Sequence, residues 1–332
     1  MRLVKFTFAV IVIVIIASYY NDSKRQTEVR RLDKYNLIQE YLLNPGKATD
    51  KKPILWIHNN YKINARNWDN FGSRNTRKLN QPYLYLCVKS IIKHCGASFN
   101  VVLIDDNSFK KLIPNWNVSM SILSDPLTTH MRLVGLSKLL YYFGGMIVPS
   151  STIAVRDFLP VYNEGVSCHG CFTTEIVNRT SASRYKEFFP SIKIMGCKKN
   201  NEIIKNMVNY LEVLALQDYT NESDFLGEVD RWLYEQTAKR RMYLTDGKKF
   251  GVKTICGKAI NIEDLLGNGS IEFDKRVLVG IYIPGDELLK RTNYQWFARL
   301  SEEQTLKAET IFSKHLLLSL GRPTQDCGVV CS

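Results

Sequence analysis

The chain has 332 residues, with 45 Lys and Arg against 32 Asp and Glu, and a formal net charge of +13 at pH 7. Its 45% hydrophobic and 23% charged content is that of ordinary globular material, and the basic surplus favours an anionic partner such as a membrane surface or a phosphorylated substrate, with general solvation by lysine as the simpler alternative. No zinc-finger spacing or aromatic RNA-binding signature accompanies the charge, so nucleic acid is not an expected partner.

An apolar segment lies at the N-terminus, over Leu3–Tyr20, with one charge, Lys5, near its edge. It is slightly short for a spanning helix of about 20 residues, but Lys5 can snorkel and the tyrosines at its end suit a membrane interface. The sequence favours an uncleaved anchor over residues 1–20. A cleaved signal peptide is the alternative, although no good small-residue cleavage site follows. More basic residues follow the segment than precede it, which by charge alone places the following chain in the cytoplasm.

Three further regions follow this segment. Residues 21–52 are polar and charge-dense, as in a stem, and residues 28–43 within them are predicted to form a helix. A single globular domain is predicted over residues 53–320. The last residues, 321–332, are expected to form a loose tail.

The cysteines and glycosylation sequons leave the compartment open. Cys168 and Cys171 have the spacing of a redox pair or of half a zinc site, but no second half matches. Cys327 and Cys331 could pair in an oxidising lumen. Buried free thiols are expected at four other positions, Cys87, Cys95, Cys197 and Cys256. Sequons support a lumenal side only weakly; they occur at Asn21, Asn117, Asn178, Asn221 and Asn268.

Short apolar runs alternate with helical patterns in the first half of the globular region. Strands are predicted at residues 54–58, 99–104 and 146–148, and helices at 81–94 and 127–143. This alternation predicts a parallel, doubly wound α/β sheet. The second half is less regular, with strands predicted at 192–195 and 277–283 and helices at 201–216, 224–239 and 301–318.

Polar residues follow the first three predicted strands, where an open α/β sheet binds its ligands. They are His58-Asn59, Asp105-Asp106 and Pro149-Ser150-Ser151. A simple turn is the alternative for each group, since Asn, Asp, Ser and Pro are turn residues. For His58, a partly buried histidine with satisfied hydrogen bonds is the simpler interpretation. If the site is real, Asn59, Asp105 and Ser150 should line one pocket.

The helix predicted over residues 127–143 is apolar on both faces, yet it carries Arg132 and Lys138. Buried charges need partners. These two side chains therefore either pair with carboxylates such as Asp105 or Asp125, or face an anionic ligand.

Together these segments resemble the glycosyltransferases of the capsular-polysaccharide-synthesis and sugar-binding D-x-D type. The resemblance covers about residues 53–318 and rests on matching order and spacing of ILWIHNNY, the Cys87–Ser90 element, FNVVLIDDNSFKKLI, LSKLLYYFGG and YQWFARLSEEQ. It implies a glycosyltransferase-A-like, Rossmann-like mixed sheet flanked by helices. It also implies a type II, single-pass membrane protein with its catalytic domain in the lumen of a Golgi- or ER-like compartment, opposite to the orientation that the charges favour.

The chain departs from this family at its metal site. In the family, the double glycine leads through a short strand into Asp-x-Asp, whose carboxylates hold Mg²⁺ or Mn²⁺ on the diphosphate of the sugar nucleotide. Here Pro149 and Ser151 occupy those positions. The family's acidic residue and arginine in the preceding helix are replaced by Leu133 and Leu136. Asp157 could supply one displaced carboxylate, and a loop acid is the simpler interpretation.

Three functions fit these residues. The first is a metal-independent glycosyltransferase, in which Lys or Arg (Arg74, Arg77, Arg132 and Lys138 are candidates) replaces the cation. The second is a degenerate member that binds glycans or proteins without turnover, and the third is a membrane-tethered structural protein.

An active enzyme would move a sugar from a nucleotide-sugar donor to a glycan or protein acceptor, with Ser150-Ser151 beside the diphosphate and Asp105-Asp106 at the nucleoside or, more remotely, at a metal ion. No catalytic base and no metal ligand is assigned, so Mn²⁺ or Mg²⁺ is not firmly expected. The candidate donor-binding residues are His58, Asn59, Asp105, Asp106, Arg132, Lys138, Ser150 and Ser151.

Overall fold

The structure is a computed structural model, and it describes residues 52–59, 81–178, 186–217 and 222–321. All of these belong to one compact unit, Lys52–Ser332. The predicted anchor, the stem before residue 52 and the tail from residue 322 lie outside the described residues. Within the described ranges, no helix combines the length and the apolar character that a membrane span requires.

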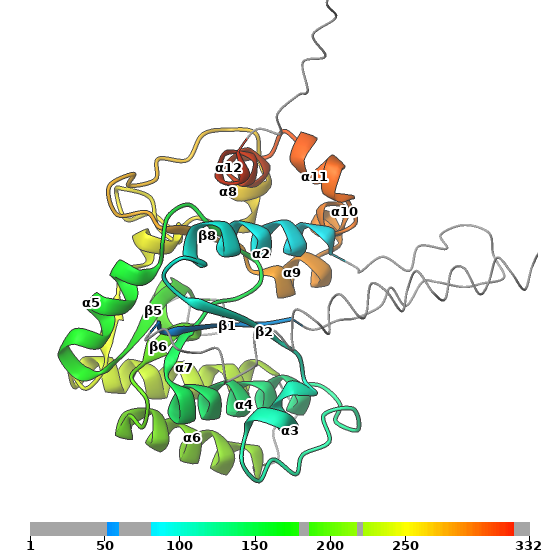
Figure 1. The fold of residues 1–332 in the computed structure, drawn as a ribbon. Coiled ribbons are helices and arrows are strands. Elements are labelled where there is room, and N and C mark those ends of the chain that lie inside the picture. The colour runs from blue at the N-terminus through cyan, green and yellow to red at the C-terminus, as the bar shows by residue number, and fades with distance from the viewer. Residues whose placement is uncertain (1–51, 60–80, 179–185, 218–221, 322–332) are drawn as a thin grey trace, which may run out of the picture. The chain divides into compact units, whose positions relative to one another are not determined.

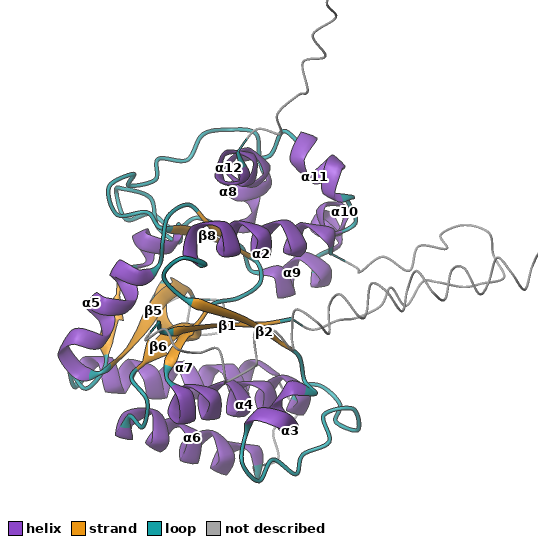
Figure 2. Cartoon of the chain, in the orientation of Figure 1, coloured by secondary structure: helices purple, strands orange, loops and turns teal. Residues whose placement is uncertain are grey.

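The core of the fold is a six-stranded sheet with the strand order β2-β1-β3-β6-β5-β7 (Figures 1 and 2). Its strands are β1 (Ile54–His58), β2 (Asn100–Ile104), β3 (Gly145–Ile147), β5 (Cys171–Val177), β6 (Phe188–Cys197) and β7 (Tyr243–Thr245). β1 pairs in parallel with both β2 and β3, whereas β6 runs antiparallel to its neighbours β3 and β5, and β7 is parallel to β5. The mixed α/β sheet flanked by helices is confirmed, and the all-parallel sheet that the alternating pattern predicted is wrong.

Helices α2 (Pro82–Cys95) and α4 (Leu127–Phe143) connect the first three strands, as the sequence predicts. Pro82 starts α2 because its fixed φ suits the first helical turn, where no intrahelical partner for its missing N–H is needed. Gly144 ends α4 with φ at +72°, a conformation that glycine adopts without strain. The chain therefore leaves α4 directly into β3.

Helices cover both faces of the sheet (Figure 1). One face carries α3 (Ser108–Leu112), α4, α6 (Glu202–Ala215) and α7 (Glu222–Ala238). The other carries α2, and a core that includes Leu55, Val101, Met146 and Phe172 also takes in residues of α5 (Leu159–His169).

A second core lies where α2 meets the C-terminal part of the chain. It contains Tyr83, Leu86, Ile153, Phe297 and Phe312. The elements of this part are η3 (Gly247–Phe250), α8 (Ile262–Leu266), α9 (Gly285–Lys290), η4 (Thr292–Tyr294), α10 (Gln295–Ala298), α11 (Glu302–Lys307) and α12 (Ile311–Leu320), with a small antiparallel sheet of β4 (Thr152–Ala154) and β8 (Gly280–Tyr282).

The second half differs from prediction in several places. The single helix predicted over residues 301–318 is two helices, because Ala308 leaves the helical conformation with ψ at 136° and Thr310 caps the start of α12. Cys256 is exposed, not buried, and Cys168 and Cys171 are both free thiols. The amide nitrogen of Asn178 donates to the carbonyl of Lys186 at 2.9 Å, and the residue is 7% exposed, so this sequon asparagine is not presented for a glycan.

The pairing of β5 with β6 is interrupted by a bulge. Thr173 lies opposite Met195, but the next residue, Thr174, lies opposite Ser191. One step along β5 therefore corresponds to four steps along β6, and residues 192–194 have no partner in β5. A bulge of this kind bends the strand and redirects its side chains.

Candidate functional site

The carboxyl ends of β1, β2 and β3 lie at one edge of the sheet, because the three strands are parallel and neighbouring. Their hydrogen bonding extends to these ends: the N–H of Asn59 donates to Ile104 at 2.9 Å, and that of Val148 donates to Trp56 at 3.1 Å. The chain adds β2 on one side of β1 and then β3 on the other. This reversal is the topological switch point, outside which open α/β sheets bind ligands.

Asp106 is the centre of a charged network at this edge. Both of its oxygens accept from Arg132, from Nε and from one terminal guanidinium nitrogen, each at 2.8 Å, and the Nε2 atom of His58 lies 3.0 Å from Oδ1. Burial alone would raise the pKa of the Asp106 carboxyl, but the hydrogen bonds from Arg132 and His58 outweigh burial and hold the pKa well below its ordinary value. Arg132 thus has a carboxylate partner, which is Asp106 and neither Asp105 nor Asp125.

The His58 ring is fixed from a second side, since it stacks on Phe109 with 5.6 Å between ring centroids and 7° between planes. The network therefore joins the ends of β1 and β2 to α4 and to α3 beneath them.

Asp105 has a separate, local task. Its Oδ1 accepts from the backbone N–H of Ser108 at 2.9 Å and from the Ser108 hydroxyl at 2.6 Å. These bonds satisfy a backbone donor at the first turn of α3, which is a capping role. The turn alternative therefore describes Asp105, while its neighbour Asp106 carries the charged network.

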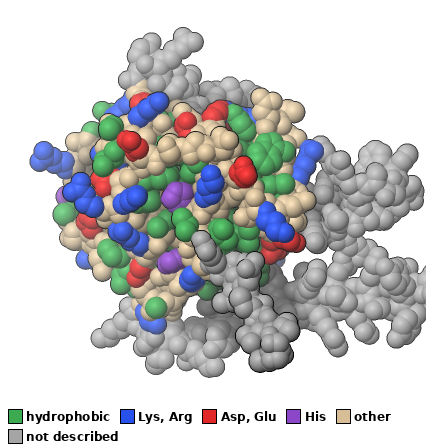
Figure 3. Space-filling view, turned by 90° about the horizontal axis from the view of Figure 1, so that it is seen from above, with side chains coloured by type: hydrophobic (Ala, Val, Ile, Leu, Met, Phe, Trp, Pro, Cys, Tyr) green, Lys and Arg blue, Asp and Glu red, His purple; other side chains and the backbone are tan. Residues whose placement is uncertain are grey.

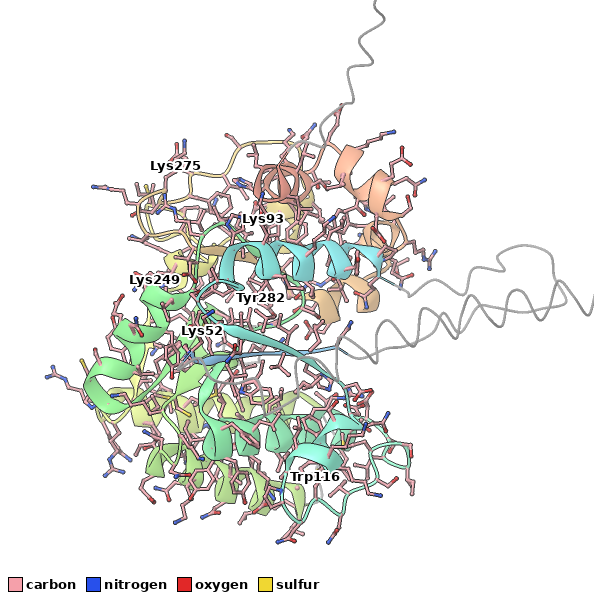
Figure 4. All side chains as sticks on the ribbon, in the orientation of Figure 1. Lys52, Lys93, Trp116, Lys249, Lys275 and Tyr282 are labelled. Atoms are coloured by element: carbon pink, nitrogen blue, oxygen red, sulfur yellow. The ribbon has the colours of Figure 1, made fainter. Side chains whose placement is uncertain are left out.

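Lys138 has partners outside this network. Its ammonium lies 2.7 Å from a Glu212 carboxylate oxygen on α6 and 5.8 Å from the centre of the Trp116 ring, which Figure 4 labels at the bottom of the view. The contacts give Lys138 the role of an ion pair between α4 and α6, a partner that the sequence did not indicate.

The residues after β3 form a turn in which the N–H of Thr152 donates to Pro149 at 3.2 Å. Ser150 is partly exposed and Ser151 is buried. The segment after β8 packs on this turn: the N–H of Ile283 donates to the Ser151 carbonyl at 3.2 Å, and a Cβ on Gly285 would lie 3.2 Å from the Ser151 Cβ. One wall of the predicted site is therefore built with residues more than a hundred positions away.

Asp157 does not supply the missing carboxylate of this turn. It accepts from the Ser98 hydroxyl at 2.6 Å and from the backbone N–H of Leu159 at 3.0 Å, at the start of α5. The loop-acid interpretation is the one that its contacts support.

A second charged group borders the same turn, and we call it the Lys193 cluster: Lys193, Asp230, Tyr282 and Asp286. The ammonium of Lys193 lies 3.1 Å from Oδ2 of Asp286 and is hydrogen-bonded to the Tyr282 hydroxyl. Tyr282 pairs with Thr152 in the small sheet, which places the cluster next to the Pro149–Thr152 turn. Figure 4 labels Tyr282 between α2 and the central sheet.

The ionisation of the Lys193 cluster is set by its surroundings. Burial would lower the pKa of the Lys193 ammonium, but its contacts with Tyr282 and Asp286 outweigh burial and raise that pKa above its ordinary value. Burial also raises the pKa of the Asp230 carboxyl, to about 7, against the opposing field of Lys193. At neutral pH the lysine is therefore charged and Asp230 is partly protonated.

The residues around the Pro149–Thr152 turn do not fit a divalent metal ion. Hard cations require several oxygen ligands, commonly carboxylates. The described part of the chain contains no group of three or more His, Cys, Asp or Glu residues arranged to hold a metal. Beside the Pro149–Thr152 turn, Asp286 is already bound to an ammonium, which would repel a second cation.

A cavity of about 400 Å³ lies at a different place, and it is lined by His169, Tyr234, Thr237, Ala238, Arg240, Met242, Tyr243 and Leu244. Pairing along the sheet puts Tyr243 level with Met146 of β3, and most of the lining residues precede or begin β7, which runs in the same direction as β3. The cavity therefore lies towards the amino ends of these strands, away from the predicted site. It contains none of the predicted site residues. The predicted pocket joining Asn59, Asp105 and Ser150 is not this cavity, and the site is defined by strand ends and contacts.

No family model matches the chain, and no curated protein matches it. Solved structures that are similar to it include galactosyltransferase LgtC in complex with donor and acceptor sugar analogs, at a TM-score of 0.38 and 10% identity over 81% of this chain and 97% of that one. The PaToxG glycosyltransferase is similar at a TM-score of 0.32 and 12% identity, over 89% of this chain and 96% of that one. The glycosyltransferase GlyE of Streptococcus pneumoniae TIGR4 is similar at a TM-score of 0.37 and 9% identity, over 83% of this chain and 66% of that one. TM-scores in this range describe a partial likeness, so function is inferred below from the residues of the site.

Sequence reasoning missed the Lys193 cluster. One signal was available, since Lys193 is the single charged residue in the apolar run Ile192–Met195 that predicts a buried strand. Nothing in the sequence connects it to Asp230, Tyr282 or Asp286. Two other basic candidates, Arg74 and Arg77, lie outside the described residues.

Proposed function

We propose that the protein is a metal-independent glycosyltransferase, which moves a sugar from a nucleotide-sugar donor to a glycan or protein acceptor. The observation that carries this proposal is the meeting of polar strand ends at the switch point of the sheet. They lie beside a turn that the paired Lys193 and Asp286 border and whose surroundings do not fit a metal. The resemblance in sequence implies that the nucleotide-sugar donor binds at this edge of the sheet. Anchoring by residues 3–20, with the domain in a Golgi- or ER-like lumen, is part of the same proposal.

The contacts divide the predicted residues into two groups. Asp105, Asp106 and Arg132 are engaged with protein partners, so we assign them to holding the site in shape, with His58 braced between Asp106 and Phe109. Asn59 and Ser150 are partly exposed at the ends of β1 and β3, and these are the residues that we expect to touch the nucleotide.

Donor hydrolysis by the full-length protein tests the proposal. The protein is incubated with UDP-, GDP- and CMP-sugars, with Mn²⁺ or with EDTA, and release of free sugar is measured. We expect release from one donor class at equal rates in Mn²⁺ and in EDTA. Loss of turnover in EDTA would reject metal independence, and absence of both turnover and donor binding would reject the enzyme.

One observation favours a second function, a glycan- or protein-binding protein without turnover. Both polar parts of the family motif are replaced, by Pro149 and Ser151 in the turn and by Leu133 and Leu136 in α4. Binding of a nucleotide sugar in the same assay, with no sugar released over hours and with any acceptor glycan, would support this function over the enzyme.

A further inference from the structure

Lys193 borders the turn after β3 through its contacts with Tyr282 and Asp286. We propose that its ammonium is a built-in cation that binds a phosphate oxygen of a nucleoside diphosphate, in the place that the resembling enzymes give to a divalent metal ion. The inference rests on the proposed function for the identity of the ligand, and it assigns a residue that the proposed function leaves open.

The sheet delivers Lys193 to this place. β6 runs antiparallel to β3, and the last pair between them joins Ile147 to Met195. Two residues after Ile147 and two residues before Met195, Lys193 comes level with Pro149, just beyond the carboxyl end of β3. Lys193 is also the middle residue of the bulge over residues 192–194, which frees it from pairing with β5 and redirects its side chain.

The ammonium retains the capacity to bind a ligand. A lysine ammonium has three N–H donors. In the described part of the chain, its hydrogen-bond partners are Asp286 and Tyr282, and its side chain is 30% exposed. One donor therefore remains for an oxygen that arrives from solvent. Asp286 is 48% exposed, so it can also turn away when a stronger anion binds.

The charges around Lys193 resemble those around a metal ion held by carboxylates. The negative charge of Asp286 cancels the positive charge of the Lys193 ammonium, so this pair has no net charge. A divalent ion held by two carboxylates also has no net charge. Asp230 is the remaining charged group of the cluster, and its carboxyl with a pKa near 7 adds between zero and one negative charge at neutral pH. The charge of Lys193 on β6 opposes the rise in the pKa of Asp230, and Tyr282 and Asp286 in turn raise the pKa of Lys193. The neighbours Glu228 and Arg231 on α7 form an ion pair with each other at 2.8 Å.

Binding of UDP, GDP and inorganic pyrophosphate, measured by calorimetry in EDTA on the full-length protein at pH 8, tests the inference. We expect Lys193→Met to weaken binding by about ten-fold or more, because it removes a hydrogen bond to a charged group, and Lys193→Arg to keep most of the affinity. Asp286→Asn and Asp230→Asn each remove a negative charge and should tighten binding. Tighter binding cannot result from structural damage, so these variants keep the test valid if Lys193→Met folds poorly.

Lys249→Met is the matched control. Lys249 is another half-buried lysine that forms an ion pair, with Glu164, and it lies at η3 (Figure 4). This variant should bind all three probes as the wild type does. Equal binding by wild type and a folded Lys193→Met would overturn the inference and leave the proposed function standing. Binding of pyrophosphate but of no nucleotide would uphold Lys193 as a phosphate-binding cation and reject the proposed donor, and binding of no probe would overturn both.

Discussion

At the scale of single residues, Asp106 offers the sharpest test of what holds the carboxyl edge together. We expect Asp106→Asn to lower the free energy of unfolding at pH 7 by about 2–3 kcal/mol, because it leaves the partly buried Arg132 without its partner. The pKa of Asp106 is lower in the folded than in the unfolded protein, so the stabilisation is present above the unfolded pKa of about 4 and is lost as the pH falls towards the folded pKa. Urea unfolding at pH 7 and pH 3 should therefore show a smaller difference between variant and wild type at pH 3.

Asp125→Asn is the control for this prediction. Asp125 is exposed and accepts a hydrogen bond from the Thr129 hydroxyl at 3.0 Å. Its substitution should change stability by less than about 0.5 kcal/mol at either pH. A penalty for Asp106→Asn that is equal at both pH values would show that the network contributes through packing and not through the charge of the carboxylate.

The two adjacent aspartates also show what sequence can resolve at this scale. Both follow a buried strand, and the pattern predicted a polar strand end correctly. Which carboxylate caps a helix and which pairs with Arg132 depends on the direction in which each side chain leaves the turn. Arg132 is 26 positions away, and no local pattern ties it to Asp106.

At the scale of elements, Gly145 fixes the junction between α4 and β3. It has φ at +98°, and a Cβ there would lie 2.2 Å from the carbonyl oxygen of Ile54 in β1. We expect Gly145→Ala to destabilise the protein by about 4 kcal/mol or more, because the added Cβ would clash with the backbone of β1, which cannot shift without losing its pairing with β2 and β3. Thermal unfolding of the purified variant, compared with wild type, measures this.

A second glycine separates conformational strain from the clash. Gly257 also has positive φ, at +85°, but no atom would lie within 4 Å of its Cβ. Gly257→Ala should therefore cost only the strain of the left-handed conformation, about 1–2 kcal/mol. Equal effects of the two substitutions would contradict the close approach of β3 to β1.

Five elements of the first half, β1, α2, β2, α4 and β3, could be predicted because each is long or apolar enough to carry its own pattern, whereas α3 and α5 were not predicted. β1 and α4 have the predicted bounds, and α2, β2 and β3 differ by one residue or so at their ends. β4 and β7, with three residues each, carry too little pattern to be recognised. The bulge in β6 depends on register against β5, which no single run of sequence contains.

At the scale of the whole molecule, strand direction is the feature that sequence left unsettled. A helix between two strands predicts parallel neighbours, and this holds for β1, β2 and β3. β5 and β6 are joined by only the residues 178–187, too few for a crossover, so they must be antiparallel. Because β5 was not predicted, this inference was not open from the sequence.

Charge is likewise a property of the whole chain that does not point to one face. Figure 3 looks onto the side of α11 and α12, where basic, acidic and apolar side chains are interspersed. The surplus of +13 is therefore not gathered into a patch on this face. Lys193, the cation of the proposed site, is distinguished by its contacts and not by the total charge.

The C-terminal helix α12 covers α2, and the two helices share one hydrophobic core. Phe312 of α12 is fully buried, with its ring centroid 6.2 Å from that of Tyr83 in α2 and 5.8 Å from that of Phe297. We expect Phe312→Ala to cost about 3–5 kcal/mol in urea unfolding, because it leaves a cavity between α2 and the C-terminal helices. Leu318→Ala is the control on the same helix; Leu318 is 75% exposed and its truncation should cost less than about 0.5 kcal/mol.

The cavity also adjoins Tyr83, whose hydroxyl lies against Gly285 beside the Ser151 turn, so nucleotide binding should weaken in Phe312→Ala even where the protein remains folded. Unchanged binding in a folded but destabilised variant would show that the C-terminal layer stabilises the fold without shaping the site.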